Sequence, residues 1–260
     1  MNRTFTQRTF SWQRRKVCQG LLSLVLGLVA CRRQMAGTAT PSPLKTVDLP
    51  DPRTRSDVSL EETLAHRRSV RQYSDEPLTM NEIAQLLWAA QGVTRDWGAR
   101  TAPSAGALYP LEVYVATPEG LYHYLPNDHR AKLLSHQDLR RALARAGLDQ
   151  SAIHDAPAVF VIAAVYTRTA GKYGDRAERY VKLEAGHVGQ NILLQAVALE
   201  LGGVPIGAFH DDQVQRVLDL PADHEPLYLI PVGRPKHPNK GQTETKNLTS
   251  RQENSLHTLE

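Results

Sequence analysis

Short apolar runs in the middle of the chain predict the strands of a sheet. Leu111–Thr117 is rich in strand-forming residues, and a Pro-Glu-Gly turn joins it to Leu121–Tyr124, which predicts a hairpin. Val159–Val165 is apolar throughout, as expected of a central strand that is covered on both faces. Further strands are expected at Val204–Phe209 and Leu227–Val232.

Helical spacing of apolar residues predicts helices between these strands. Thr79 is a candidate N-cap because a glutamate stands three residues later, the spacing of a capping box. Other helices are expected at Leu60–Arg67 and His136–Ala146, and the longest pattern runs over Ala177–Leu201. Beyond Ile192 its apolar residues surround the helix, so this half is expected to be buried. Strands and helices do not follow a strict strand–helix–strand repeat, which predicts the α+β class.

The two ends of the chain differ in composition from this core. Residues 1–31 carry five basic residues and no acidic residue, and Val17–Ala30 is an almost unbroken apolar segment. It is shorter than the roughly 20 residues that span a bilayer, a pattern typical of an export signal. The polar composition of residues 32–58 predicts a flexible tether, and the polar stretch 237–260 is expected to be disordered. A single globular domain is therefore expected at 59–236.

The signal ends in Leu-Val-Ala-Cys, which resembles the lipobox of bacterial lipoproteins. The resemblance implies lipidation of Cys31, export, and attachment to the periplasmic side of a bacterial membrane in the cell envelope. A stop-transfer anchor or a chance cysteine are the alternatives, and the short apolar segment favours lipid. Cys18 would leave with the signal, so no free thiol would remain for a disulfide or a catalytic site. The pair Arg14 and Arg15 leaves the twin-arginine and general secretory routes both open.

The charge balance of the chain depends on this signal. The sequence has 31 Lys and Arg against 27 Asp and Glu, and removing the five basic residues of the signal leaves 26 against 27. The working domain is therefore almost neutral, which argues against a nucleic-acid partner. The sequence also lacks a dinucleotide-binding glycine motif, a phosphate loop, a serine-hydrolase elbow and a paired-histidine motif. No metal site is expected.

Two short segments are the main candidates for binding chemistry. Arg67–Arg71 places three guanidinium groups and one hydroxyl within five residues, and Arg binds phosphate through two parallel hydrogen bonds. Pro103–Pro110 is a turn of small residues against which a flat ligand can lie. A solvated basic surface and an ordinary turn are the simpler interpretations of each segment alone. Together the two segments indicate an anionic, planar cofactor.

In this order the two segments resemble the nitroreductase family of FMN oxidoreductases. Within that family they are similar to the SagB/ThcOx-type dehydrogenases, some of which oxidise thiazolines and oxazolines in modified peptides. Further segments extend the resemblance towards Lys236: Lys172–Arg176, Leu183–Asn191, Gly202–Phe209 and Val232–Arg234. The resemblance implies a central mixed or antiparallel sheet flanked by helices, and an intertwined homodimer with FMN at its interface.

The resemblance also implies which residues bind FMN. Five residues would hold the phosphate and ribityl chain: Arg67, Arg68, Ser69, Arg71 and Arg234. The other subunit would contribute four residues: Pro103, Ser104, Ala105 and Ala107. Gly207 and Ala208 would lie beside the isoalloxazine ring, where small residues let a backbone N–H approach N5. The segment Pro205–Ala208 lacks the acidic residue of the usual nitroreductase pattern, which argues against a simple NAD(P)H-driven nitroreductase.

Lys172 and Tyr173 are the candidate catalytic acid/base pair by the same resemblance. The alternative interpretation is a surface lysine beside a half-buried tyrosine. On the long helix, His187 is expected to be a hydrogen-bonded core histidine rather than a flavin contact. Glu184 is expected to pair with an arginine near the start of that helix, Arg176 or Arg179, rather than to act in catalysis.

The expected function is hydride transfer through flavin N5 to an unknown acceptor. NAD(P)H is one candidate electron donor, and the substrate would be a small molecule or a peptide. One alternative is an azoline dehydrogenase that acts on a modified peptide, although such peptides are normally modified in the cytoplasm. The other is a surface lipoprotein that binds flavin or another ligand without turnover, which would not need a phosphate clamp.

Overall fold

The structure is a computed structural model that describes residues 45–236. The predictions for the signal at 1–31, for Cys31, for residues 32–44 of the tether and for the tail at 237–260 lie outside the described residues. Among the helices of residues 45–236, none combines the length and the apolar composition that crossing a bilayer requires.

Seven strands of the described chain form one sheet in the order β1-β4-β3-β2-β5-β7-β6. All pairings between these strands are antiparallel. The strands are β1 (Thr46–Asp48), β2 (Leu111–Thr117), β3 (Gly120–Leu125), β4 (Arg130–Ser135), β5 (Ala158–Ala164), β6 (Gly202–Gly203) and β7 (Glu225–Gly233). Every residue of β5 is buried, which confirms the prediction of a central strand from its unbroken apolar sequence.

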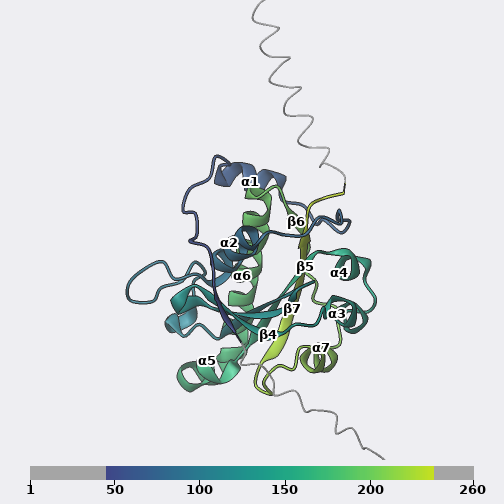
Figure 1. Cartoon of the computed structure of the whole chain (residues 1–260). Helices are drawn as coiled ribbons and strands as arrows, with labels where there is room; N and C mark the ends of the chain where they lie inside the picture. Colours follow the sequence, from purple (N-terminus) through teal and green to yellow (C-terminus); the bar gives the residue numbers. More distant parts are fainter. Residues whose placement is uncertain (1–44, 237–260) are drawn as a thin grey trace, which may run out of the picture. The chain divides into compact units, whose positions relative to one another are not determined.

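Helices cover both faces of the sheet (Figure 1). Their bounds are α1 (Leu60–His66), α2 (Met80–Gln91), α3 (Arg140–Ala146), α4 (Ser151–Asp155), α5 (Tyr166–Tyr173), α6 (Ala177–Ala198) and α7 (Asp211–Val217). Helices α2 and α6 pack on one face, while α3, α4 and α7 pack on the other. Three short 3₁₀ turns complete the fold: η1 (Ala105–Ala107), η2 (Pro126–Asp128) and η3 (Gly174–Arg176). This arrangement confirms the predicted α+β class.

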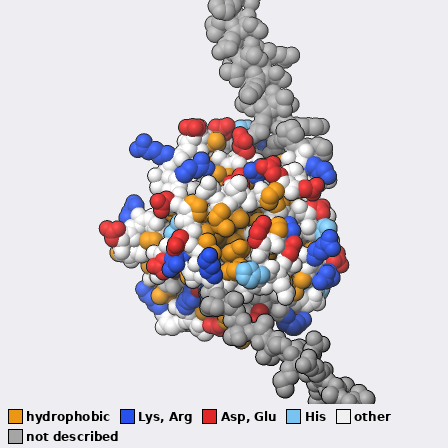
Figure 2. Space-filling model, in the orientation of Figure 1, with side chains coloured by type: hydrophobic (Ala, Val, Ile, Leu, Met, Phe, Trp, Pro, Cys, Tyr) orange, Lys and Arg blue, Asp and Glu red, His pale blue; other side chains and the backbone are white. Residues whose placement is uncertain are grey.

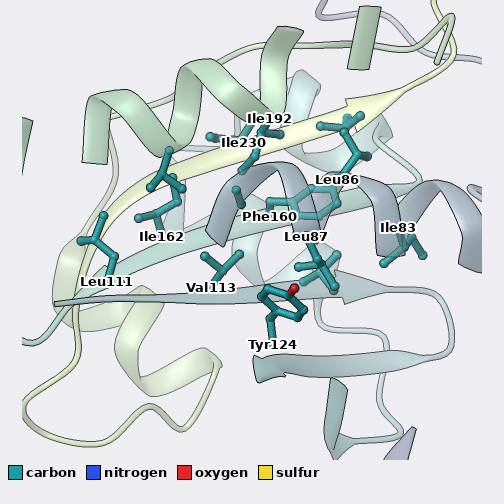
Figure 3. Close-up of a cluster of buried hydrophobic side chains, with 14 of the residues drawn as sticks. Ile83, Leu86, Leu87, Leu111, Val113, Tyr124, Phe160, Ile162, Ile192 and Ile230 are labelled. Carbon is teal, nitrogen blue, oxygen red and sulfur yellow. The ribbon is translucent and has the colours of Figure 1, made fainter. Parts of the chain in front are cut away.

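The period-two alternation of the strands divides the core between these two helical layers. Side chains that face α2 and α6 include Val113, Phe160, Ile162 and Ile230 (Figure 3). The intervening residues, among them Val161 and Leu229, pack with α3, α4 and α7. Each fully buried large aliphatic or aromatic side chain stabilises the fold by about 1.5–3 kcal/mol relative to exposure. The sheet is therefore a rigid base from which loops and short helices present polar groups.

Two of the predicted helices agree closely with the structure. Thr79 caps α2: its hydroxyl accepts from the backbone N–H of Glu82 at 3.3 Å, and the Glu82 carboxylate accepts from the Thr79 N–H at 2.7 Å. Helix α6 ends at Ala198, and no residue of the stretch 191–199 is exposed. The predicted capping box is confirmed. The predicted burial of this half-helix is confirmed only in part, because Leu193 and Ala196 are buried while the other residues of 193–199 are half-buried.

Three predictions about element boundaries are wrong. Val204–Phe209 is not a strand: only Gly202–Gly203 pairs with β7, followed by an isolated bridge at Ile206, because Pro205 has no N–H to donate to a ladder. The tether was expected to reach residue 58, but β1 pairs with β4 and Leu49 is buried, so the folded domain begins earlier. The helix expected from His136 begins only at Arg140.

Candidate functional site

The arginine segment is fixed against the end of the sheet. Arg67 ends α1 as its C-cap, and the chain then runs beside β6, where the Val70 N–H donates to the Gly203 carbonyl at 3.1 Å. Val70 packs so tightly that a Cβ on Gly202 would lie 2.4 Å from its Cγ2. The Ser74 N–H then donates to the Arg234 carbonyl at 2.9 Å. Segments from opposite ends of the domain therefore meet here.

A buried tyrosine holds this segment in place. Tyr73 is 4% exposed. Its hydroxyl is shared as a donor between two carbonyl oxygens, that of Val70 at 2.5 Å and that of Pro231 at 3.1 Å. Burial raises the pKa of Tyr73 well above its usual value, so the hydroxyl stays a donor. Its structural role was not identified from the sequence, although an aromatic residue two positions after Arg71 was a signal that could have suggested it.

The guanidinium groups of the segment differ in their surroundings. Within residues 45–236, neither Arg67 nor Arg68 nor Arg71 forms an ion pair. The Nη1 of Arg68 turns back and donates to the carbonyls of Ala65 and Arg67 at 2.8 and 2.9 Å. Arg67 is half-buried and Arg71 is exposed. Cations without carboxylate partners beside one another favour an anionic ligand.

Arg234 lies at the same edge but is already paired. Its Nε lies 2.9 Å from a Glu76 carboxylate oxygen, and its Nη2 lies 2.9 Å from one of Glu82. Its Nη1 is buried and has no hydrogen-bond partner among the described residues. Two carboxylates therefore balance this guanidinium, and its contact with a phosphate stays a prediction.

The small-residue turn adopts an unusual backbone. Gly106 has φ 63°, and Ala107 and Tyr109 also have positive φ values of 54° and 46°. The Ser104 hydroxyl accepts from the Tyr109 N–H at 2.9 Å and closes the turn. Pro103, Gly106 and Ala107 are exposed, and Ala105 is half-buried. Non-glycine residues in the left-handed region are strained, which is typical of a binding turn.

Lys172 and Tyr173 lie against this turn. A Cβ on Gly106 would be 3.0 Å from both the Lys172 Nζ and the Tyr173 hydroxyl. Lys172 is exposed and Tyr173 is half-buried, with its ring edge-on to Tyr180 at a centroid distance of 5.0 Å. Two segments that were predicted separately, about 65 residues apart in sequence, are thus brought together.

A buried polar cluster lies under the turn. Arg100 stacks over the Tyr109 ring at 4.6 Å and donates to the Gln91 side-chain carbonyl at 3.0 Å. Glu184 of α6 is 3% exposed, and burial raises its pKa, while the nearby polar side chains of Ser104 and Gln91 and the charge of Arg100 act in the opposite direction. Sequence reasoning missed Gln91 and Arg100, which carry no motif.

The structure corrects two predictions for α6. Glu184 does not pair with Arg176 or Arg179: it points into the buried cluster under the turn, because it lies on the helix face that packs inward with Val181 and Ala185. His187 is exposed and is not a core histidine, since it lies on the outward face of α6. Whether a side chain of α6 is buried therefore depends on the helix face on which it lies, and not on the residue type alone.

A second polar network anchors the sheet end of the turn. On β2, Glu112 accepts from the His123 Nε2 at 2.6 Å and from the Arg168 guanidinium. Burial opposes ionisation of Glu112, but the hydrogen bonds from His123 and Arg168 outweigh it and lower its pKa to about 2. Arg168 also donates to the Tyr109 carbonyl at 3.2 Å, so the network reaches the turn.

Gly207 and Ala208 are exposed after the single bridge at Ile206. A Cβ on Gly207 would meet only the Tyr228 ring, at 3.9 Å, so a flat ligand has room there. The carbonyl of Ala208 accepts from the Gln150 side-chain amide at 2.9 Å, which fixes the peptide.

A polar hollow lies next to the arginine segment but does not include the predicted cofactor residues. Its volume is about 660 Å³, and it adjoins Tyr73 and is lined also by Gln72, Arg140, His154 and Lys236. In the described part of the chain, no three His, Cys, Asp or Glu side chains gather as metal ligands would. The predicted site within one chain is therefore an open surface with cations on one segment and a strained turn on another.

Comparison with known proteins identifies the family. The model of the nitroreductase family matches residues 64–234. A relative named as a nitroreductase in Methanocaldococcus jannaschii is 45% identical over 194 residues, which is 72% of this chain and 96% of the relative. A solved structure from Ralstonia eutropha, described as a nitroreductase, is 33% identical with a TM-score of 0.67, over 74% of this chain and 90% of that chain.

A more distant solved structure shares the fold, and a more distant relative matches in sequence. The NADPH:FMN oxidoreductase of Vibrio harveyi, solved with NAD+, is 22% identical with a TM-score of 0.53, over 69% of this chain and 70% of that chain. A trifolitoxin operon protein of Rhizobium leguminosarum is 23% identical over 65% of this chain and 54% of its own length. On the family model and the 45% identical relative together, this chain belongs to the nitroreductase family of oxidoreductases.

Proposed function

We propose that the protein is an FMN-dependent oxidoreductase that works as a homodimer. The observation that carries this proposal is the arginine segment, which β6 holds rigidly while Arg67 and Arg71 have no carboxylate partner in the described chain. A dianionic phosphate satisfies such a pair through charge-assisted hydrogen bonds. A plain solvated surface would not need a tyrosine and a tightly packed valine to fix the backbone.

The residues present fit FMN. Arg67, Arg71 and the Ser69 hydroxyl would hold its phosphate, and the exposed peptide at Gly207 and Ala208 has room for a flat ring. Bound FMN would supply the two-electron chemistry, accepting a hydride from a donor such as NAD(P)H and passing it to an acceptor. The chain's own part is to bind, to orient the reactants and to exclude water.

Lys172 and Tyr173 would supply the proton that accompanies the hydride. Their polar ends lie at Gly106, in the turn that would face the flavin. When an acceptor takes up a hydride it also needs one proton, and the Lys172 ammonium or the Tyr173 hydroxyl can donate it. When a substrate is instead oxidised and loses a hydride, Lys172 or Tyr173 in its deprotonated form can accept the proton that the substrate releases.

A second copy of the chain would complete the site. Pro103, Gly106 and Ala107 are exposed in one chain, and α6 carries the exposed Leu183 beside Gly186, where an added Cβ would meet nothing within 4 Å. Figure 2 shows hydrophobic side chains gathered in the middle of one face, in the region where α2 and α6 run in Figure 1. An exposed leucine beside a glycine lets a partner subunit pack closely against α6.

An azoline dehydrogenase that acts on a modified peptide is the second candidate. It is favoured by the Lys172-Tyr173 contact with Gly106, and by the similarity to a protein of the trifolitoxin operon. In this reaction the ring substrate would lose a hydride to FMN and a proton to Lys172 or Tyr173, so two electrons leave it. A re-oxidant of the flavin, such as O₂, would close the cycle.

We also propose export and a lipid anchor on Cys31. The support is the basic, then apolar, then Ala-Cys order of residues 1–31, which lie outside the described structure. The domain would then act at the periplasmic side of a bacterial membrane. Mass spectrometry of the mature N-terminus tests this proposal: a diacylated Cys31 supports it, and an unmodified cysteine contradicts it.

The visible spectrum of the purified full-length protein tests the enzyme proposal. A yellow protein with FMN bound after reconstitution, bleached anaerobically by NAD(P)H, supports an NAD(P)H-dependent oxidoreductase. Bound FMN that NAD(P)H does not bleach favours the azoline dehydrogenase. Failure to retain flavin contradicts both enzymes and leaves a lipoprotein that binds another ligand.

A further inference from the structure

Helix α5 carries Lys172 and Tyr173 but buries very little. Of its eight residues only Thr169 is buried, and Tyr166 and Tyr173 are half-buried. Its N-terminus also lacks a side-chain cap. Isolated helices of this length are not stable in water, so contacts with the rest of the domain must hold α5 over the turn.

Within the described residues, the side-chain hydrogen bonds between α5 and the rest of the domain all come from Arg168. Its guanidinium donates to the Tyr109 carbonyl at 3.2 Å and to a Glu112 carboxylate oxygen. Arg168 and Lys172 are four residues apart and therefore share one face of the helix. One end of this face is thus tied to Tyr109, while the other end lies against Gly106 of the same turn.

Glu112 is itself held rigidly by the sheet. Its side chain is 14% exposed, and its second oxygen accepts from the His123 Nε2 at 2.6 Å. The His123 ring stacks on Tyr114 at a centroid distance of 4.5 Å, and the Tyr114 hydroxyl lies 2.7 Å from the His224 Nδ1. Both oxygens of Glu112 are therefore occupied, and the anchor extends from β2 through β3 to the start of β7.

We propose that Glu112 is a positioning residue: through Arg168 it holds α5 on the turn and so places Lys172 and Tyr173 at the reaction site. Glu112 does not touch the cofactor residues itself. The inference rests on the proposed function for its effect on turnover, but its effect on α5 stands on the contacts alone. The low pKa of Glu112 is consistent with this role, since the carboxylate stays charged at neutral pH.

Hydrogen exchange of the flavin-free, full-length protein tests the anchor independently of activity. In Glu112→Gln we expect amides of α5 to exchange about tenfold faster or more, because local opening costs less free energy once the charged anchor is lost. Amides of α2 should be unchanged. The matched control is Glu178→Gln, which removes the same charge from an exposed pair with Lys182. Unchanged α5 exchange in Glu112→Gln would overturn the proposal.

Kinetics then test the link to the reaction. With FMN bound and reduced by NADPH, we expect Glu112→Gln to lower the rate of hydride transfer from the reduced flavin to a nitroaromatic acceptor about 10- to 100-fold at nearly unchanged FMN affinity. Misplacement of a proton donor by about 1 Å costs up to about 100-fold. In a Lys172→Ala background the same change should add no further loss, because Glu112 acts through that helix.

The outcomes separate the two proposals. A full additional loss in the Lys172→Ala background, or a wild-type rate in Glu112→Gln, contradicts the positioning role. A wild-type protein that binds no FMN contradicts the proposed function, and hydrogen exchange then still decides whether Glu112 anchors α5. If FMN is bound but NADPH does not reduce it, hydrogen exchange likewise decides whether Glu112 anchors α5.

Discussion

Lys172 of α5 lies over Gly106 of the turn, so that a Cβ on Gly106 would be 3.0 Å from the Lys172 Nζ. Gly106 also has φ 63°, where an L residue costs roughly 1–2 kcal/mol. We expect Gly106→Ala to lower the free energy of unfolding by about this amount and to slow hydride transfer from the reduced flavin to an acceptor, because the new methyl group displaces Lys172. Chemical denaturation and stopped-flow reoxidation of the reduced flavin by a nitroaromatic acceptor measure the two effects.

Gly171→Ala is the matched control within α5, since an added Cβ there meets nothing within 4 Å. It replaces glycine in a helix, so stability should stay the same or rise by up to about 1 kcal/mol. Equal losses of activity in both variants would show that the contact between Gly106 and Lys172 is unimportant.

Gly202→Ala should release the arginine segment. The new Cβ would lie 2.4 Å from the Val70 Cγ2, so β6 and the segment cannot keep their hydrogen bond. We expect a loss of about 1–3 kcal/mol in stability, typical of overpacking, together with weaker FMN binding. Fluorescence titration with FMN measures the second effect.

Val70→Ala in the same chain should restore part of both losses, because it removes the methyl groups that the new Cβ strikes. If the double variant binds FMN no better than Gly202→Ala alone, the packing of Val70 does not determine the geometry of the arginines.

Glu112 should make the domain sensitive to acid. Its pKa falls from about 4.5 to about 2 on folding, so its contribution is fully present above pH 4.5 and is lost as the pH falls towards 2. This shift corresponds to about 3 kcal/mol, to order of magnitude. The difference in unfolding free energy between wild type and Glu112→Gln should be constant above pH 5 and shrink by about that amount below it. A difference that does not change between pH 5 and pH 2 would contradict the assignment.

Leu183→Glu should weaken the proposed homodimer. Leu183 is 54% exposed on α6, and a charge in an apolar interface carries a desolvation cost. Sedimentation velocity should show a shift from dimer to monomer. Leu148→Glu, at 51% exposure after α3, is the control and should leave the dimer intact. Dimers of equal stability in both variants would place the interface elsewhere.

The sequence predicted the elements whose own residues determine them. Val159–Val165 is apolar at every position, and Thr79 has its glutamate at capping-box spacing, so local pattern was sufficient for β5 and α2. The sequence pattern does not predict β1, which lies within the expected tether. This strand forms only by pairing with β4, whose residues lie about 85 positions later in the chain.

Some residues of the candidate site could likewise be predicted from the sequence, and others could not. Arg67, Ser69, Lys172 and Tyr173 could be singled out because their residue types and order resemble a family pattern. Gln91, Arg100, Glu112 and Arg168 could not, since each acts through partners that only the fold brings near. The carboxylates that balance Arg234 were hidden for the same reason.

The most direct test of the central claim is the FMN affinity of Arg67→Ala/Arg71→Ala, measured by equilibrium titration of the full-length protein. Each lost charge-assisted hydrogen bond costs about 1.5–3 kcal/mol, so the dissociation constant should rise by about 100-fold or more. Arg141→Ala/Arg145→Ala removes the same charge from exposed positions of α3 and should bind FMN like the wild type. Wild-type FMN affinity in Arg67→Ala/Arg71→Ala would contradict the proposed phosphate site.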